Sequence, residues 1–225
     1  MSLVSRLRMA HKPARAPVPP RGRTLVLARR LDETQAARRE RAVEAARSLA
    51  EAGGYAAVTM AAVADRAGIS RATLYRYFAS KDHLLAEVTS RWGAEIVAQL
   101  RGEPLRGRSA GARVARVFAR VFAIAEAHPR LTEAAVTAAL SAEPSAAAAS
   151  SGNAGVVSEY LASALSDVAP REREAVARVL AHVFLAALVL LISGRTTARR
   201  AAAELAHAAQ LLLARPRGGA TPRRA

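Results

Sequence analysis

The stretch VTMAAVADRAGISRATLYRYFASKDHLL, residues Val58–Leu85, decides how this chain folds. Thr59 and Ser70 are N-cap residues, and each is followed by apolar residues at helical spacing. Gly68, between these two segments, can adopt the left-handed conformation that ends a helix. The pattern predicts a short helix, a glycine turn, a second short helix and a third that starts at Ser80. A helix-turn-helix places one helix in the major groove, so the predicted partner is duplex DNA.

This stretch resembles the DNA-binding domain of the TetR family of bacterial transcriptional regulators. The segments GGYAAV, AVADRAG and TLYRYF are most similar to actinobacterial regulators of steroid catabolism. Ala72 departs from the family pattern, which usually has glycine there. The resemblance covers roughly a quarter of the chain. The residues that carry it are Gly54-Tyr55, Val58-Thr59, Val63-Ala64, Ala67-Gly68-Ile69-Ser70, Thr73-Leu74-Tyr75, Tyr77-Phe78, Ser80-Lys81 and Leu84-Leu85.

The composition narrows the class of protein. The chain has no cysteine, which excludes disulfides, thiolate metal sites and thiol catalysis and fits a reducing cytosol. Residues 1–23 contain no continuous apolar run, so we expect no signal peptide and a cytoplasmic location. The most apolar run, Val183–Ile192, is too short to span a bilayer and is interpreted as a buried helix.

The net charge of +16 is concentrated at the two ends of the chain. Residues 1–30 hold eight Lys or Arg and residues 214–225 hold four, with no acid in either segment. Because these segments also contain Pro and Gly, we expect disordered basic tails over 1–31 and 214–225. They are either solvated and unselective, or arms that follow DNA phosphates or enter the minor groove. The arginines nearest the DNA-binding domain are Arg21, Arg23, Arg29 and Arg30.

The rest of the pattern is helical, which predicts an all-α protein. Residues 32–100 form the helix-turn-helix domain, whose first helix starts near Asp32 or Thr34 and ends at Gly53-Gly54, and whose fourth helix runs from Ser80 to about residue 100. Residues 101–213 form a helical effector-binding and dimerisation domain. Its predicted helices cover 109–127, 131–140, 156–168, 170–192 and 196–213, with a loop or frayed helix start at 143–155.

The second helix of the motif, Ser70–Phe78, is predicted to lie in the major groove with its first turn at the base edges. Arg71 can pair bidentately with guanine, and Thr73 can hydrogen-bond a base or touch a thymine methyl. Ala72 is small enough to let the helix approach closely, and Arg76 reaches phosphate.

Several further residues are candidates for phosphate contact. Tyr75 and Tyr77 are two residues apart, so they cannot share a helical face. The resemblance implies that Tyr75 contacts phosphate and that Tyr77 does so or packs inward; the alternative is that both belong to the core. Thr59 and Lys81 stand at helix starts, which favour phosphate, although capping alone explains Thr59 and Ser80. The predicted DNA-binding set is Thr59, Ser70, Arg71, Ala72, Thr73, Tyr75, Arg76, Tyr77 and Lys81.

The resemblance implies a homodimer and an effector cavity. The last two helices are the predicted dimer surface, because Val179–Ile192 is apolar nearly all round; an ordinary central core helix is the alternative. The cavity is predicted to be apolar, with His182, Ser158 and Thr137 as orienting groups, and plain core packing is the alternative for each lining residue. A steroid-like, acyl or drug-like effector fits this lining. The predicted lining residues are Trp92, Phe118, Phe122, Tyr160, Phe184 and Leu188.

We predict a ligand-responsive repressor that binds a palindromic operator, with the fourth helix linking cavity and DNA. The five histidines are scattered, and the sequence contains no HExxH, GxSxG or glycine-rich phosphate motif, so no enzyme activity, metal or cofactor is expected. The alternative is a low-specificity architectural DNA-binding protein driven by its basic tails. Sequence-selective binding distinguishes the two.

Overall fold

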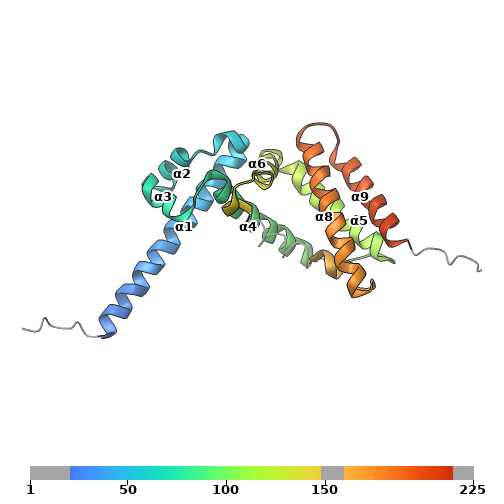
Figure 1. The fold of residues 1–225 in the computed structure, drawn as a ribbon, viewed down its shortest axis with the longest axis horizontal. Coiled ribbons are helices and arrows are strands. Elements are labelled where there is room, and N and C mark those ends of the chain that lie inside the picture. Colours follow the sequence, from blue (N-terminus) through green and yellow to red (C-terminus); the bar gives the residue numbers. More distant parts are fainter. Residues whose placement is uncertain (1–20, 148–159, 215–225) are drawn as a thin grey trace, which may run out of the picture. The chain divides into compact units, whose positions relative to one another are not determined.

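The computed structural model describes residues 21–147 and 160–214, with the backbone alone at 21–33, and it contains helices and no strand over those residues (Figure 1). Residues 1–37 and 38–225 form two separate units, and the contacts described below lie within the second. Most of each expected basic tail and the candidate orienting group Ser158 lie outside the described residues.

The helix-turn-helix forms as its sequence predicts. Helices α2 (Met60–Ala67) and α3 (Arg71–Tyr77) each begin after a capping hydroxyl. Thr59 Oγ1 accepts the Ala62 amide at 3.1 Å, and Ser70 Oγ accepts the Thr73 amide at 3.1 Å. Gly68 ends α2 in the left-handed conformation, with a φ of 64°. These caps satisfy amides that a helix start leaves unpaired, which is why local sequence is enough to place both helices.

Helix α1 (Arg21–Ala57) begins eleven residues before Asp32, so residues 21–31 are helical where a disordered arm is predicted. The prolines of this part of the chain all precede Arg21, and the following residues TLVLARRL include the good helix formers Leu, Ala and Arg. The predicted end is confirmed, because the helix is interrupted at Gly53 and Gly54.

The remaining helices lie close to their predicted bounds. Of the helix predicted over 156–168, residues 160–168 are described; residues 160–164 are helical and 165–168 form a turn, so the helix ends four residues earlier than predicted. Residues 144–147 form one helical turn. Helix α8 begins at a proline, as predicted, because proline lacks only an amide that the first turn leaves unpaired. These helices are α4 (Lys81–Arg101), α5 (Ala110–Ala127), α6 (Pro129–Ala139), α8 (Pro170–Ile192) and α9 (Ala198–Leu213).

Two hydrophobic cores share α4. The first core holds α2, α3 and the first half of α4 against α1, and the second joins the end of α4 to α5, α8 and α9. Figure 1 shows α5, α8 and α9 side by side. Helix α6 packs into the first core through Leu131, Ala134 and Ala138, although residues 101–213 are predicted to form a separate domain. These residues form one apolar stripe at helical spacing, and that stripe is covered by the first core.

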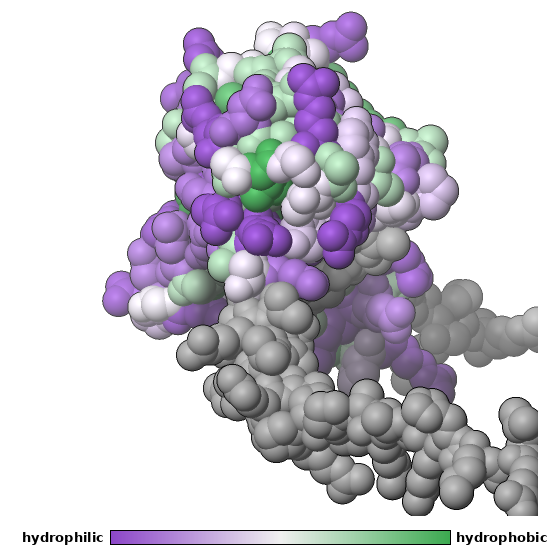
Figure 2. All heavy atoms as spheres, turned by 90° about the vertical axis from the view of Figure 1, so that its left-hand side faces the viewer, coloured by the Kyte–Doolittle hydropathy of each residue, from purple (hydrophilic) through white to green (hydrophobic). Residues whose placement is uncertain are grey.

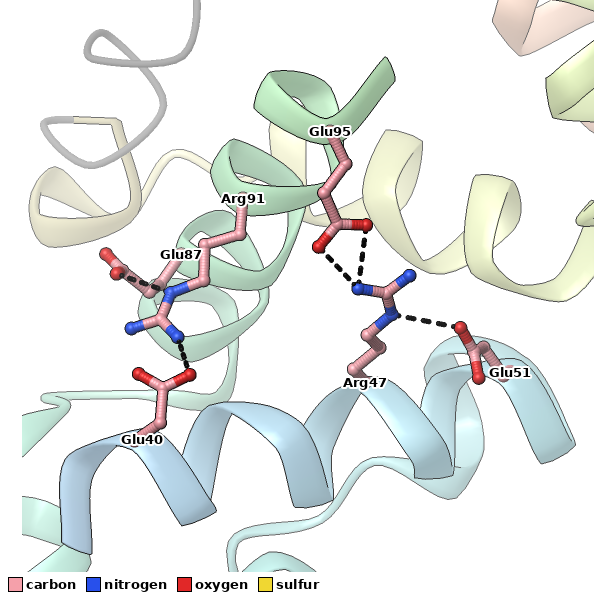
Figure 3. Close-up of polar contacts among 6 residues, drawn as sticks. All are labelled: Glu40, Arg47, Glu51, Glu87, Arg91 and Glu95. Atoms are coloured by element: carbon pink, nitrogen blue, oxygen red, sulfur yellow. Dashed lines mark hydrogen bonds and ion pairs between the residues drawn. The ribbon is translucent and has the colours of Figure 1, made fainter. Parts of the chain in front are cut away.

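Ion pairs hold the middle of α4 against α1 (Figure 3). Arg91 of α4 contacts Glu40 of α1 and, at 3.3 Å, Glu87 of its own helix. Arg47 of α1 contacts Glu95 of α4 at 2.7 Å. Burial raises the pKa of Glu87, but hydrogen bonds and charge from Arg39 and Arg91 lower it overall. Each such surface pair stabilises the fold by only about 0.2–1 kcal/mol. Packing in the apolar core therefore contributes most to the stability of the contact between α1 and α4.

Helix α8 differs from its prediction. By length and composition alone, it is long and apolar enough to cross a membrane. Core helices of soluble proteins meet the same test. The sequence predicts a buried helix at Val183–Ile192, yet only Val176, Leu180 and Ala187 of α8 are buried in the single chain. The reason is that its neighbours in the described part of one chain cover only one of its sides.

Two glycines at turns allow a matched stability prediction. Gly54 has φ 67° and ψ −160°, a region that is essentially restricted to glycine, and an added Cβ would lie 1.9 Å from Glu133 Oε2. Gly68 has the milder left-handed conformation and open space around its Cα. We expect Gly68→Ala to cost about 1 kcal/mol and Gly54→Ala about 2–3 kcal/mol. Urea unfolding of both variants measures this, and equal losses would contradict the close approach of Glu133.

Candidate DNA-binding surface and apolar cavity

Helix α3 is anchored by two buried side chains and presents polar ones. Leu74 and Phe78 are fully buried in the first core, as predicted. Arg71 and Arg76 are exposed, and Tyr75 is 55% exposed, so the alternative that places Tyr75 in the core is wrong. Figure 2, seen from the side on which α2 and α3 lie in Figure 1, shows mostly hydrophilic side chains. This is the character that contact with a phosphate backbone requires.

The remaining residues of the predicted DNA-binding set differ in their solvent exposure and in whether their polar groups are already hydrogen-bonded. Thr59, Ser70 and Ala72 are exposed. Thr73 is half-buried, and its hydroxyl lies 2.9 Å from the hydroxyl of Ser70. The polar group of Thr73 is therefore turned toward the cap, where it stabilises the first turn of α3.

Tyr77 and Lys81 lie closer to the protein interior. Tyr77 is half-buried and packs on the first core, with its ring 6.5 Å from the ring of Phe78. The Lys81 ammonium donates to the Tyr55 carbonyl at 3.2 Å and lies 3.4 Å from the centre of the Tyr55 ring. Burial lowers the pKa of Lys81. Lys81 thus joins the start of α4 to the turn before α2, a role that the sequence does not reveal.

An apolar cavity of about 220 Å³ lies between α4, α5, α6 and α8. Five of the six predicted residues line it: Trp92, Phe118, Tyr160, Phe184 and Leu188. Phe122 does not line it. Its fully buried ring packs edge-on against Phe184 at 5.4 Å within the second core, so for Phe122 the alternative of plain core packing applies.

The polar groups of the cavity wall are paired with the protein backbone. Thr89 Oγ1 donates to the Leu85 carbonyl at 2.8 Å, and Thr132 Oγ1 donates to the Ala125 carbonyl at 3.0 Å. The Tyr160 hydroxyl donates to the Leu100 carbonyl at 3.1 Å, and burial raises its pKa, which keeps the phenol neutral. With these groups satisfied, the wall is effectively apolar.

Two of the three predicted orienting groups, His182 and Thr137, lie outside the cavity lining. His182 is exposed on α8, and Thr137 is half-buried outside the lining. Thr89 and Thr132 are the lining hydroxyls that sequence reasoning missed. A signal for Thr89 exists in the sequence, because Thr89, Trp92 and Ile96 recur at helical spacing on one face of α4.

A hollow lined by arginines, here called the arginine cleft, adjoins the cavity and shares Leu100, Val117 and Tyr160 with it. Arg113 is held by the Ala164 carbonyl, and Arg120 pairs with Glu103. Arg106 and Arg116 are exposed. The arginines that line the cleft are Arg106, Arg113, Arg116 and Arg120.

No group of three metal-ligating side chains occurs among the residues that the structure describes. Among the described residues, the polar face of α3 and the cavity with its arginine cleft are the candidate functional features.

Comparison with protein families identifies both halves of the chain. Residues 42–88 match the family described as bacterial regulatory proteins of the tetR family. Residues 107–212 match the tetracyclin repressor-like C-terminal domain. The first match contains α2, α3 and the start of α4, and the second contains α5, α6, α8 and α9.

Individual relatives agree with these matches. The HTH-type transcriptional repressor KstR of Rhodococcus jostii is 37% identical over 180 residues, which are 80% of this chain and 84% of that protein. KstR of Mycolicibacterium smegmatis is 35% identical over 80% of this chain and 89% of its own length. A TetR regulator structure from Rhodococcus sp. RHA1 superimposes with a TM-score of 0.72 at 26% identity, covering 80% of this chain and 97% of that one.

The fold alone is shared with Thermus thermophilus FadR, solved in complex with lauroyl-CoA. That comparison has a TM-score of 0.63 at 20% identity and covers 81% of this chain and 98% of the FadR chain.

Proposed function

Because this chain belongs to the TetR family of bacterial transcriptional regulators, we propose that it is a repressor whose operator affinity is set by a small molecule bound in the apolar cavity. Its family and relatives are regulators rather than enzymes, so the cavity is a binding site and not an active site. The observation that carries the proposal is the capped α3, which presents Arg71, Tyr75 and Arg76 from a rigid core.

DNA recognition follows from the geometry of α3. Arg71 occupies the first position of α3, whose N-terminal turn meets the base edges in this type of motif. Its guanidinium can pair bidentately with guanine, which supplies sequence discrimination. Tyr75 and Arg76 lie further along the exposed face and contact phosphate, which positions the helix without specifying sequence. The rival proposal, an architectural protein driven by its basic tails, requires no such base contact.

Capture of sheared genomic DNA from the source organism by the purified chain, followed by sequencing, tests the repressor proposal. We expect a few sharp peaks that share a two-fold symmetric site. On that site Arg71→Ala should lose about 1–3 kcal/mol of binding free energy, measured by fluorescence anisotropy at fixed salt. The control is Arg108→Ala, which removes the same charge from an exposed loop and should leave specific affinity nearly unchanged. A flat, salt-sensitive capture profile would support the architectural protein instead.

We propose that the chain dimerises through α8 and α9. A symmetric operator needs two copies of α3, about one helical turn of DNA or a multiple apart. The apolar residues Val179 and Leu190 of α8 and Leu211 and Leu212 of α9 are 37% to 64% exposed in the single chain. Large apolar side chains left exposed on neighbouring helices are typical of subunit interfaces.

Sedimentation equilibrium tests the dimer. Leu190→Glu places a charge in the proposed interface, where burial without a partner is costly, so this variant should sediment as a monomer. The matched control is Leu140→Glu, which alters a similarly exposed leucine at the end of α6 and should remain dimeric. A dimeric Leu190→Glu variant would show that the interface lies elsewhere.

We propose that the effector combines an apolar body with an anionic group. The cavity wall offers only satisfied polar groups, which favours a steroid-like or acyl body. The adjoining arginine cleft offers Arg106 and Arg116 to a carboxylate or phosphate. Two comparisons support this chemistry: the relatives named KstR resemble the chain over most of its length, and FadR, which has the same fold, binds lauroyl-CoA.

Thermal unfolding with lauroyl-CoA, lauric acid and the neutral steroid testosterone as probes tests the effector class. A probe at a hundred times its dissociation constant should stabilise the chain by about 2.7 kcal/mol. Arg116→Ala should weaken lauroyl-CoA more than testosterone, because only the former carries phosphates. Equal weakening of both would remove the arginine cleft from the proposal, and stabilisation by none of the three would contradict the effector class.

A further inference from the structure

Helix α3 spans seven residues, so few contacts decide how it lies on the rest of the DNA-binding domain. Leu74 is buried within the helix, and Phe78, its C-cap residue, is buried at its end. The Phe78 backbone is extended, and its amide donates to the Leu74 carbonyl at 3.0 Å. Any group that holds the Phe78 ring in place therefore also holds the C-terminal end of α3.

Side chains from α1, α3 and α4 contact the Phe78 ring. Tyr77 and His83 meet it in T-shaped geometry, with ring centres 6.5 Å and 5.5 Å away. The His83 ring is itself held, because its Nδ1 accepts the Ala79 amide at 3.2 Å. The Arg39 guanidinium of α1 lies over the face of the Phe78 ring, 5.2 Å from its centre. An aromatic face carries partial negative charge, so this is the position that a cation prefers.

The Arg39 guanidinium is also held by a carboxylate of α4. Arg39 Nη1 donates to Glu87 Oε1 at 3.1 Å, and Nη2 lies 3.1 Å from Glu87 Oε2. A two-point contact of this kind fixes the plane of the guanidinium as well as its position. One arginine of α1 thus joins the end of α3 to α4.

Glu87 has a second cationic partner on its own helix. Arg91 contacts Glu87 Oε1 at 3.3 Å and also contacts Glu40 of α1 (Figure 3). Removal of Arg39 therefore leaves Glu87 paired, and removal of Arg91 leaves Arg39 over the Phe78 ring. Among the described residues, Arg39 is the one cation that lies over this ring.

We propose that Arg39 is a positioning residue for DNA recognition, which fixes the end of α3 so that Arg71 meets the base edges in register. A bidentate contact with guanine requires one orientation of the Arg71 guanidinium. Nonspecific binding rests on attraction between charges, which depends little on the orientation of α3. Affinity for an operator falls with the fraction of molecules in which α3 is correctly placed. This inference rests on the proposed function, because it concerns how a sequence-specific repressor reads its site.

Two other roles for Arg39 predict different results. A residue that only stabilises the fold would lower the melting temperature and leave DNA binding by the folded protein unchanged. A residue that contacts phosphate would weaken binding to all DNA alike, and its removal would lower the slope of log affinity against log salt by about one. The Arg39 side chain is 37% exposed, so the phosphate role is tested directly.

The test measures the affinity of the full chain for its operator and for an unrelated duplex of the same length, at fixed salt and well below the melting temperature. We expect Arg39→Ala to weaken operator binding by about five- to tenfold and binding of the unrelated duplex by less than about twofold, with an unchanged salt slope. Arg39→Lys keeps the charge but loses the planar fork, so it should also weaken operator binding. Full operator affinity in Arg39→Lys, or equal losses on both duplexes, would overturn the proposal.

Arg91→Ala is the matched control. It removes an arginine from the same carboxylate but leaves the contact with the Phe78 ring, so operator affinity should stay within about twofold of the unaltered chain. A loss as large as that of Arg39→Ala would assign the effect to the ion pairs between α1 and α4 and contradict the proposal.

A double-mutant cycle of Arg39→Ala with Phe78→Leu isolates the ring contact. In the Phe78→Leu background, Arg39→Ala should weaken operator binding by less than about twofold. If circular dichroism shows that Phe78→Leu does not fold, Glu87→Gln takes its place, because it weakens the hold on the Arg39 guanidinium. A loss from Arg39→Ala that is as large in the altered background would count against the proposal.

Amide hydrogen exchange of the free protein separates this inference from the proposed function. Arg39→Ala should speed exchange in a peptide covering residues 71–79 by about fivefold or more, and Arg91→Ala by less than about twofold. If exchange responds in this way but genomic capture yields no symmetric site, the hold of Arg39 on α3 stands and the repressor proposal fails. If a symmetric operator is found, but its affinity and the exchange of α3 do not respond to Arg39→Ala, the repressor stands and this inference fails.

Discussion

Burial of Leu74 and Phe78 is the constraint on which the DNA-binding surface depends. Both side chains are fully buried in the first core. Leu74 is buried within α3, and Phe78 is buried directly after it as its extended C-cap residue, while Arg71, Tyr75 and Arg76 remain exposed. The Arg39 guanidinium, 5.2 Å from the centre of the Phe78 ring, adds a cation–π contact from α1. The rotation of α3 is therefore set by the core and not by contact with DNA.

The cavity exists where two close-packed cores meet. Trp92 of α4 packs in the first core and Val97 in the second, and the space between the two cores is closed by α5, α6 and α8. Thr89 and Thr132 turn their hydroxyls to backbone carbonyls, so the wall presents no unpaired hydrogen-bonding group of theirs to water. An apolar wall of this kind favours an apolar ligand, which would gain dispersion contacts there.

Local features of this chain were predictable from sequence, and long-range ones were not. The caps at Thr59 and Ser70 and the turn at Gly68 involve residues within a few positions, so their pattern places α2 and α3. Whether Phe122 lines the cavity, and whether the outer side of α8 is buried, depends on helices distant in sequence. The contact between Tyr55 and Glu133 joins residues 78 apart, and an apolar stripe on α6 does not say which core will cover it.

The contacts around α4 and α6 differ in how well they tolerate movement. The ion pairs between α1 and α4, such as Arg47 with Glu95, lie on long exposed side chains that can adjust as α4 turns. Glu133 of α6, by contrast, accepts a backbone amide, that of Tyr55, beside Gly54, whose φ of 67° and ψ of −160° are essentially restricted to glycine. This contact therefore depends on the backbone conformation of the turn as well as on the Glu133 side chain. If an effector fills the cavity as we propose, its effect on operator affinity and the effect of DNA on effector affinity must be equal in free energy.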